Sequence, residues 1–116
     1  MVYSFLPAMM RRWQEFAKLM NQEAYGLGAT NSHFVNPHGL HEDNHYTTAY
    51  DLYLIFNECL KQEQFVKMIT EKSHTGQFKG KDGSARTETW KNTSLYMTGE
   101  AEKPTTVEYL GGKTGN

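Results

Sequence analysis

The sequence predicts an α+β fold in which three helices precede a small antiparallel sheet. The first observation is helical, because apolar residues recur every three or four positions between Pro7 and Leu27. The second is a change of pattern near Lys72, after which apolar and polar residues alternate as they do in strands. The third is the Asp82-Gly83 pair between two such runs, because Asp-Gly is a strong signal for a β-hairpin.

The first helix is expected from about Pro7 to Leu27, with its start within Ser4–Pro7. Gly28 supplies the left-handed residue that commonly ends a helix. A polar connection should follow, with a short extended piece at His33–Val35 and a turn at Asn36–Gly39. We therefore expect the first helix to be followed by irregular backbone rather than by a second helix.

The second helix should begin at Thr47 or Thr48 and run to about Lys61. Thr48 and Asp51 have the spacing of a reciprocal cap, in which each side chain bonds the other residue's backbone N–H. A third, shorter helix is expected at about Glu63–Ile69, where the apolar residues are spaced to share one buried face.

Two extended runs should form the hairpin, at Lys72–Lys79 and Ala85–Trp90. A charged loop is expected at Thr98–Pro104, and a final strand from about Thr105 to the end of the chain. Residues 1–116 are thus predicted to form a single partial domain, with a helical part at about 5–70 and a hairpin and last strand at about 72–116.

The composition predicts one modest domain with a thin core. The mean hydropathy of the 116 residues is -0.70, although 38% of them are hydrophobic. Phe34, Leu40 and Leu52 are expected in the core, and Cys59 is expected to be a buried, inert thiol because it lies on an apolar helical face.

Charge and hydropathy exclude several classes of function. The 12 basic and 13 acidic side chains are interspersed and give a net charge of -1, so no basic face is available for nucleic acid. The apolar opening at Met1–Met10 is short and contains Pro7, and its two arginines follow it, so we do not interpret it as a signal peptide. No stretch is long and apolar enough to predict a transmembrane span.

The run Lys113-Thr114-Gly115, preceded by two glycines, is the most informative motif. A phosphate-binding P-loop would require glycine where this chain has Val107. Valine favours extended backbone and resists the positive φ that such a loop needs, so the P-loop interpretation is disfavoured. The other use of Lys-Thr-Gly is on a strand facing a nucleophilic serine, as in penicillin-interacting enzymes that also carry Ser-x-x-Lys and Ser-x-Asn.

Longer segments of the chain resemble the serine-type D-alanyl-D-alanine carboxypeptidases, the low-molecular-weight penicillin-binding proteins. The resemblance extends over most of the chain and follows the family's order. The matching segments are Phe16–Gln22, residues 31–40 (Asn-Ser-His-Phe-Val-Asn-Pro-His-Gly-Leu), residues 45–52 (His-Tyr-Thr-Thr-Ala-Tyr-Asp-Leu), Lys91–Thr93 and Lys113–Gly115.

The resemblance implies part of a β-lactamase/transpeptidase-like domain and a substrate-binding role for Lys113, Thr114 and Gly115. The lysine would help to bind the terminal carboxylate of a peptidoglycan stem peptide or a β-lactam, the strand backbone would align the peptide, and the glycine would leave the groove open. No cofactor and no metal are implied. The parent protein would act outside the cytoplasm, in the periplasm or at the cell surface.

The nucleophile of that family is missing from the sequence. None of the five serines is followed three residues later by lysine, and none is followed two residues later by asparagine. We therefore expect an internal fragment of a carboxypeptidase that is inactive alone, because acylation needs the serine. Strand edges left without neighbours would favour self-association.

A zinc site is one alternative. The histidines of the 33–45 loop are close in sequence and have carboxylates between them, and imidazole and carboxylate both suit zinc. The loop lacks the fixed helical spacing of a His-Glu-x-x-His site, and it contains proline and glycine. The four candidate ligands are His33, His38, His41 and His45.

A second alternative is a non-catalytic module that binds peptidoglycan or peptides through aromatic rings. Exposed rings can stack on sugars or peptides, although in a chain of this length such residues more often lie in the core or on a half-buried sheet. The candidate rings are Tyr46, Tyr50, Tyr53, Trp90 and Tyr96.

Overall fold

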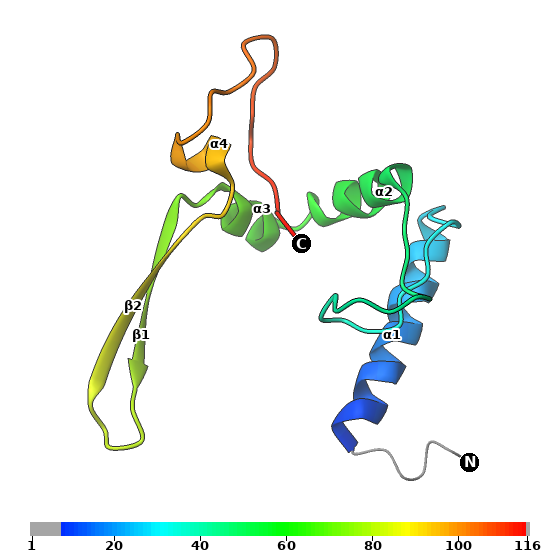
Figure 1. Ribbon diagram of the computed structural model, residues 1–116, viewed down its shortest axis with the longest axis horizontal. Helices are drawn as coiled ribbons and strands as arrows, with labels where there is room; N and C mark the ends of the chain where they lie inside the picture. Colours follow the sequence, from blue (N-terminus) through cyan, green and yellow to red (C-terminus); the bar gives the residue numbers. More distant parts are fainter. Residues whose placement is uncertain (1–7, 116) are drawn as a thin grey trace. The chain divides into compact units, whose positions relative to one another are not determined.

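The computed structural model describes residues 8–115 and has the predicted α+β composition (Figure 1). Helices lead and a two-stranded antiparallel sheet follows, so the fold class is confirmed. The elements are α1 (Ala8–Gly26), α2 (Ala49–Cys59), α3 (Glu63–Thr70), β1 (Ser73–Lys79), β2 (Ala85–Lys91) and α4 (Leu95–Thr98). None of the helices in this part of the chain combines the length and apolarity that crossing a bilayer requires.

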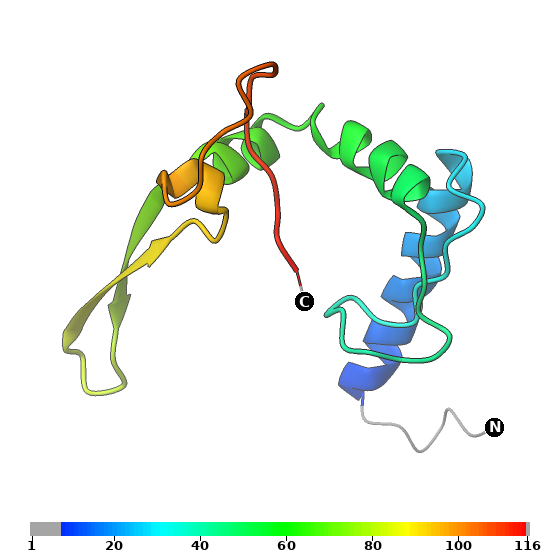
Figure 2. The ribbon, with the colours of Figure 1, turned by 45° about the horizontal axis from the view of Figure 1, so that its top comes forward.

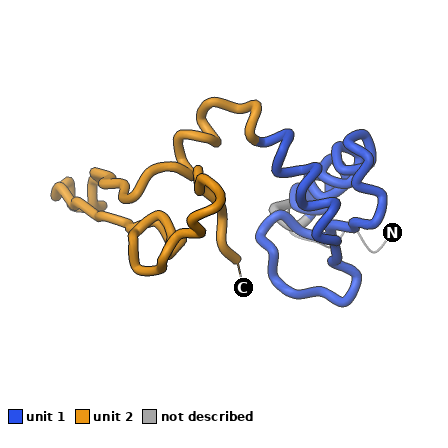
Figure 3. Tube along the Cα trace, turned by 90° about the horizontal axis from the view of Figure 1, so that it is seen from above, with its two compact units in different colours: residues 1–59 blue, residues 60–116 orange. Residues whose placement is uncertain are grey.

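The chain divides into two compact units, residues 1–59 and residues 60–116 (Figure 3). The predicted division between a helical part and a sheet part falls elsewhere, near residue 71. Helix α3 therefore belongs with the hairpin and not with the two longer helices. The single domain stays a prediction, and each unit is described by itself.

In unit 1, helix α1 ends as the sequence predicts. Gly28 has a φ of 85°, in the left-handed region. Its N–H donates to the carbonyl of Tyr25 at 3.0 Å, and the N–H of Ala29 donates to the carbonyl of Ala24 at 2.9 Å. This pair of bonds is a Schellman motif, which satisfies carbonyls that the helix end would otherwise leave unpaired. The predicted start at Ser4–Pro7 lies outside the described residues.

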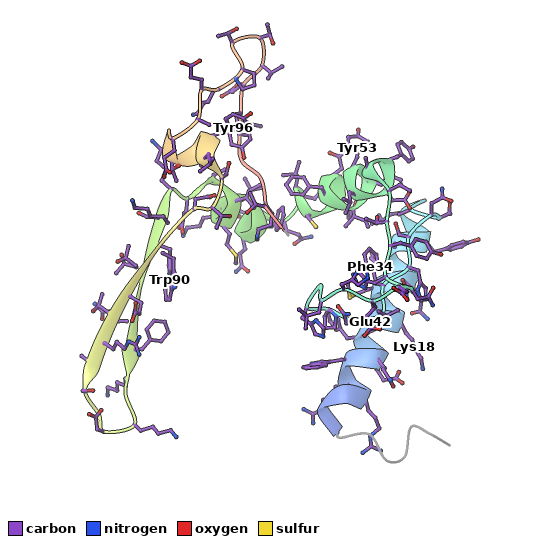
Figure 4. All side chains as sticks on the ribbon, viewed as in Figure 1. Lys18, Phe34, Glu42, Tyr53, Trp90 and Tyr96 are labelled. Carbon is purple, nitrogen blue, oxygen red and sulfur yellow. The ribbon has the colours of Figure 1, made fainter. Side chains whose placement is uncertain are left out.

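The connection after α1 is held by side-chain amides. The extended piece at 33–35 is confirmed as a single antiparallel bridge between His33 and Tyr46. The Asn21 amide makes two bonds to Phe34, donating to its carbonyl at 2.8 Å and accepting from its N–H at 2.7 Å. Phe34 therefore lies on a loop that is fixed to α1 (Figure 4).

The predicted turn at 36–39 forms around a buried asparagine. The Oδ1 atom of Asn36 accepts from the N–H of Gly39 at 2.8 Å, and its Nδ2 atom donates to the carbonyl of Leu40 at 3.1 Å. Gly39 has a φ of 77°, which only glycine adopts readily. The turn is thus specified by an asparagine and a glycine three residues apart.

The second helix begins with half of the predicted reciprocal cap. The Thr48 hydroxyl accepts from the N–H of Asp51 at 3.1 Å. The Asp51 carboxylate does not return to Thr48; its Oδ2 atom accepts from the N–H of Asn31 at 2.8 Å and from the hydroxyl of Ser32 at 2.6 Å. Aspartate is shorter than the glutamate of a capping box, and here it joins two segments of the chain. It is 1% exposed.

The apolar core is small, and two residues expected in it are exposed. Among residues 11–59 of unit 1, whose burial the structure describes, the buried apolar residues are Ala17, Ala24 and Ala29. Leu40 is 69% exposed and Leu52 is 50% exposed, which corrects the sequence prediction, while Phe34 is half-buried. Helical spacing placed Leu52 on an apolar face, but the described residues of this unit leave half of its surface exposed. Cys59 is half-buried rather than buried.

In unit 2, the predicted hairpin is confirmed. Strands β1 and β2 pair in antiparallel register from Ser73 with Lys91 to Lys79 with Ala85. The connecting turn includes Gly83 at a φ of 82°. Hydrogen bonds from the Ser84 hydroxyl and backbone N–H to the carboxylate of Asp82 hold the pKa of that carboxyl below its ordinary value of 3.8.

Two differences from the prediction concern the end of the chain. Helix α4 was not predicted, because four residues are too few to show a helical period. The strand expected from about Thr105 is absent from the described residues: the segment 105–115 has no regular secondary structure and pairs with no strand. A strand is defined by the ladder that it forms, and β1 and β2 pair only with each other.

Replacing Asp51 by alanine should destabilise unit 1 by about 1–3 kcal/mol, because the change leaves the Asn31 N–H and the Ser32 hydroxyl without their buried acceptor. Urea denaturation followed by circular dichroism measures the loss. Asp43→Ala is the matched control, since that carboxylate is fully exposed beside His41. Equal stability of the two variants would show that the buried carboxylate does not hold this unit together.

Candidate functional site

The candidate residues Lys113, Thr114 and Gly115 are all exposed and lie in a segment without a ladder. The chain leaves α4, makes a loop and returns beside α3 (Figures 1 and 2). The Lys113 ammonium donates to the backbone carbonyl of Thr114. The segment that carries the motif thus belongs to unit 2 and is placed by contacts within that unit.

The two glycines before the motif allow a close approach. A Cβ atom added at Gly111 would lie 2.7 Å from the backbone carbonyl oxygen of Ile69, at the end of α3. A Cβ atom at Gly112 would lie 2.9 Å from the Tyr109 hydroxyl. The first contact is with backbone, so position 111 accepts a side chain only if the segment moves. A Cβ atom added at Gly115 would meet no described atom within 4 Å apart from its chain neighbours, so a small side chain fits at the last residue of the motif.

A turn at Asn92–Ser94 forms the base on which this segment rests. The N–H of Asn92 donates to the carbonyl of Lys72 at 2.9 Å. The Asn92 amide donates to the carbonyl of Glu71 at 2.8 Å and accepts from the N–H of Ser94 at 2.9 Å. One asparagine therefore joins the start of the hairpin, its end and the turn that follows it.

Two hydroxyl contacts connect that turn to the motif segment. The hydroxyls of Thr93 and Thr114 are 2.5 Å apart, and those of Ser94 and Tyr109 are 2.7 Å apart. Ser94 is 5% exposed, and the Tyr109 ring packs against Tyr96 with their centroids 5.2 Å apart. Consecutive residues of the turn thus hold the segment at two points, before the glycines and within Lys-Thr-Gly.

Sequence reasoning found one half of this arrangement. Lys91–Thr93 was included in the family resemblance, but no role followed from it. The partners of Thr93 and Ser94 are 21 and 15 residues away in sequence, and no local periodicity reports such a pairing. The clearest signal in the sequence was the glycine pair before the motif. It indicates that the backbone approaches another part of the chain closely, but it does not identify that part.

Three of the described serines use their hydroxyl groups in hydrogen bonds to side chains of their own unit. Ser32 bonds Asp51 and Thr47, Ser84 bonds Asp82, and Ser94 bonds Tyr109. An attacking serine needs a base or a lysine beside it, and the sequence supplies no Ser-x-x-Lys. The arrangement offers an exposed ammonium and hydroxyl, which suit an anionic ligand, but no activated nucleophile.

The structure gives no support to a zinc site in the 33–45 loop. His33 bonds the carbonyl of Asn44 through Nδ1 at 2.6 Å, and His45 accepts from the N–H of Val35 through Nδ1 at 3.1 Å. His38 accepts from a neighbouring backbone N–H, and His41 pairs with Asp43. Within residues 8–115, no three histidine, cysteine or carboxylate side chains come together as metal ligands would.

The five candidate aromatic residues are exposed and are divided between the two units. Tyr50 and Tyr53 pair on α2 with centroids 6.3 Å apart, and Tyr46 lies beside His33. Trp90 projects from the hairpin and Tyr96 lies on α4, both in the other unit (Figure 4). The structure therefore groups some rings in pairs and leaves the binding module as an unsupported alternative.

Comparison with known proteins identifies the family of the chain. Residues 12–116 match the model of the D-alanyl-D-alanine carboxypeptidase family, peptidase S11. The chain belongs to this family of serine-type carboxypeptidases, which confirms the resemblance found in the sequence.

Individual relatives and a solved structure agree with this result. A D-alanyl-D-alanine carboxypeptidase of Bacillus subtilis, DacF, is 46% identical over 47% of the chain, and the Streptomyces sp. K15 enzyme is 34% identical over 72%. The crystal structure of the Streptomyces K15 DD-transpeptidase matches 72% of the chain with a TM-score of 0.67 and 34% identity. These matches cover 14%, 29% and 32% of the respective proteins, so the chain spans less than a third of each.

Substituting Gly111 by alanine should displace the motif segment from α3, because the added methyl group meets the Ile69 carbonyl oxygen. We expect the backbone amide resonances of Tyr109–Gly115 and of Ile69 to shift together in a ¹⁵N NMR spectrum. Gly115→Ala is the control, since that methyl group enters open space. If both substitutions perturb only their immediate neighbours, the segment does not pack against α3.

Proposed function

We propose that this chain is the part of a D-Ala-D-Ala carboxypeptidase that carries the Lys-Thr-Gly side of the substrate site. The whole enzyme would remove the terminal D-alanine from peptidoglycan stem peptides through an acyl-enzyme, outside the cytoplasm. One observation carries the proposal: in a chain of this family, Lys-Thr-Gly is held in an exposed position by the Asn92–Ser94 turn.

The proposed chemistry separates binding from bond cleavage. Lys113 would attract the carboxylate that ends the stem peptide, and the backbone from Leu110 to Gly115 would align the peptide beside it, since backbone groups that belong to no ladder can pair with an added strand. The serine that attacks the peptide bond, and the oxyanion hole that stabilises the intermediate, would be supplied by residues other than these 116. The chain alone would therefore recognise its ligand without acylation.

The 116-residue chain should bind acetyl-D-Ala-D-Ala weakly and remain unmodified by penicillin. NMR titration with the dipeptide should shift the resonances of Lys113, Thr114 and Gly115, because the carboxylate approaches the ammonium there. Intact mass spectrometry after incubation with labelled benzylpenicillin should show no adduct, because no Ser-x-x-Lys is present.

Two lysine variants serve as test and control in that titration. Lys113→Ala should weaken the response about 10-fold or more, the usual loss for a hydrogen bond to a charged group. Lys103→Ala removes an exposed lysine of the preceding loop and should leave the response unchanged. A stoichiometric penicillin adduct would refute the proposed division of roles, and equal responses of both variants would remove Lys113 from the binding site.

We also propose that the chain self-associates through the hairpin. The two-stranded sheet has an open edge on each strand, and open edges can pair with another chain. Light scattering should show a mass that rises with concentration above that of the 13.3 kDa monomer. Gln77→Pro, in the middle of β1, should lower this mass, while a constant monomeric mass for the unaltered chain would count against the proposal.

A further inference from the structure

The contact between Thr93 and Thr114 has a consequence beyond holding the segment in place. In the part of the chain that the structure describes, it is the side-chain hydrogen bond that joins Lys-Thr-Gly to a residue distant in sequence. Both hydroxyls are exposed, so the pair contributes little to a core. Exposure also means that a ligand which reaches Lys113 can reach the neighbouring hydroxyl of Thr114.

Thr93 is fixed because the residues on both sides of it are anchored. Asn92 bonds the backbone of Glu71 and Lys72, and Ser94 is buried and bonds Tyr109. The backbone of Thr93 is therefore held in place by hydrogen bonds, whereas Thr114 lies on a segment that belongs to no strand. The better-fixed hydroxyl therefore determines the position of the other.

The direction of the proton between the two hydroxyls decides what Thr114 can bind. A threonine hydroxyl has a single proton, and one of the two protons of the pair occupies the contact. If Thr114 donates to Thr93, it has no proton left for a ligand. If Thr93 donates to Thr114, the proton of Thr114 is free. A carboxylate has no proton to give, so it can accept from Thr114 only in the second arrangement.

We propose that Thr93 is a positioning residue, which donates to Thr114 and so directs the Thr114 hydroxyl proton toward a ligand carboxylate held near Lys113. Thr93 itself does not touch the ligand. The chain of hydrogen bonds from Thr93 through Thr114 to the anion strengthens each link by polarisation. This inference rests on the proposed function, in which the ligand is a peptide that ends in a carboxylate.

The decisive variants are Thr93→Val, which keeps the shape and removes the hydroxyl, and Thr93→Ser, which restores a hydroxyl. Thr89→Val is the matched control, because Thr89 forms an equally exposed threonine pair with Thr75 at 2.9 Å on the hairpin. Each variant of the 116-residue chain is titrated by NMR with acetyl-D-Ala-D-Ala and with the same dipeptide ending in a carboxamide. Three-bond couplings to Cγ2 of Thr114 report its side-chain rotamer without ligand.

We expect Thr93→Val to average the Thr114 rotamer and to weaken binding of the carboxylate dipeptide about threefold to tenfold, the usual effect of one hydrogen bond. Binding of the carboxamide should change less, because an amide can also donate. Thr93→Ser should recover most of the carboxylate affinity, and Thr89→Val should behave as the unaltered chain. A purely structural role would weaken both ligands equally.

The outcomes separate this inference from the function on which it rests. If Lys113 and Thr114 of the unaltered chain do not respond to the carboxylate dipeptide, the proposed function fails. If they respond but Thr93→Val leaves both the rotamer and the preference for carboxylate over carboxamide unchanged, the proposed function stands and the positioning role of Thr93 is overturned.

Discussion

The geometry of the candidate site depends on the hydrogen bonds of one asparagine. The side-chain NH₂ and the backbone N–H of Asn92 donate to carbonyls near the start of the hairpin. Its side-chain oxygen accepts from the N–H of Ser94, which follows the end of the hairpin. A two-stranded hairpin is marginally stable by itself, so this closure of its open end matters for the strands as well as for the turn. Because Thr93 and Ser94 both start from this turn, the position of Lys-Thr-Gly is set by the same interaction.

Hydrogen bonds from polar side chains to the backbone also hold unit 1 together, in the segment that forms no regular secondary structure. Asn21, Asn36 and Asp51 each bind N–H or C=O groups of the segment between the two helices. Irregular backbone needs such partners because its own groups cannot pair along a helix or a ladder. These residues replace part of what apolar packing supplies elsewhere, which fits the finding that the buried apolar residues among residues 11–59 are alanines.

The sequence predicted well wherever the signal was local. Gly28 and Gly39 marked a helix end and a turn, Asp82-Gly83 marked the hairpin, and the resemblance identified the family. It predicted poorly wherever the outcome depended on a distant partner. Periodicity showed that Leu52 lies on an apolar face but not what covers it. Asp51 had the spacing of a cap, although its carboxylate binds residues 19 and 20 positions away.

The strand expected from about Thr105 is the most informative error. Its sequence is compatible with a strand, but no neighbouring strand pairs with it in the described residues. A β-branched residue such as Val107 favours strand formation, but a ladder also needs a neighbouring strand. In unit 2 the segment is positioned by two hydroxyl contacts and by the close approach of Gly111 to α3. Under the proposed function, a peptide would pair with the backbone of this segment, because no strand of the described residues occupies that position.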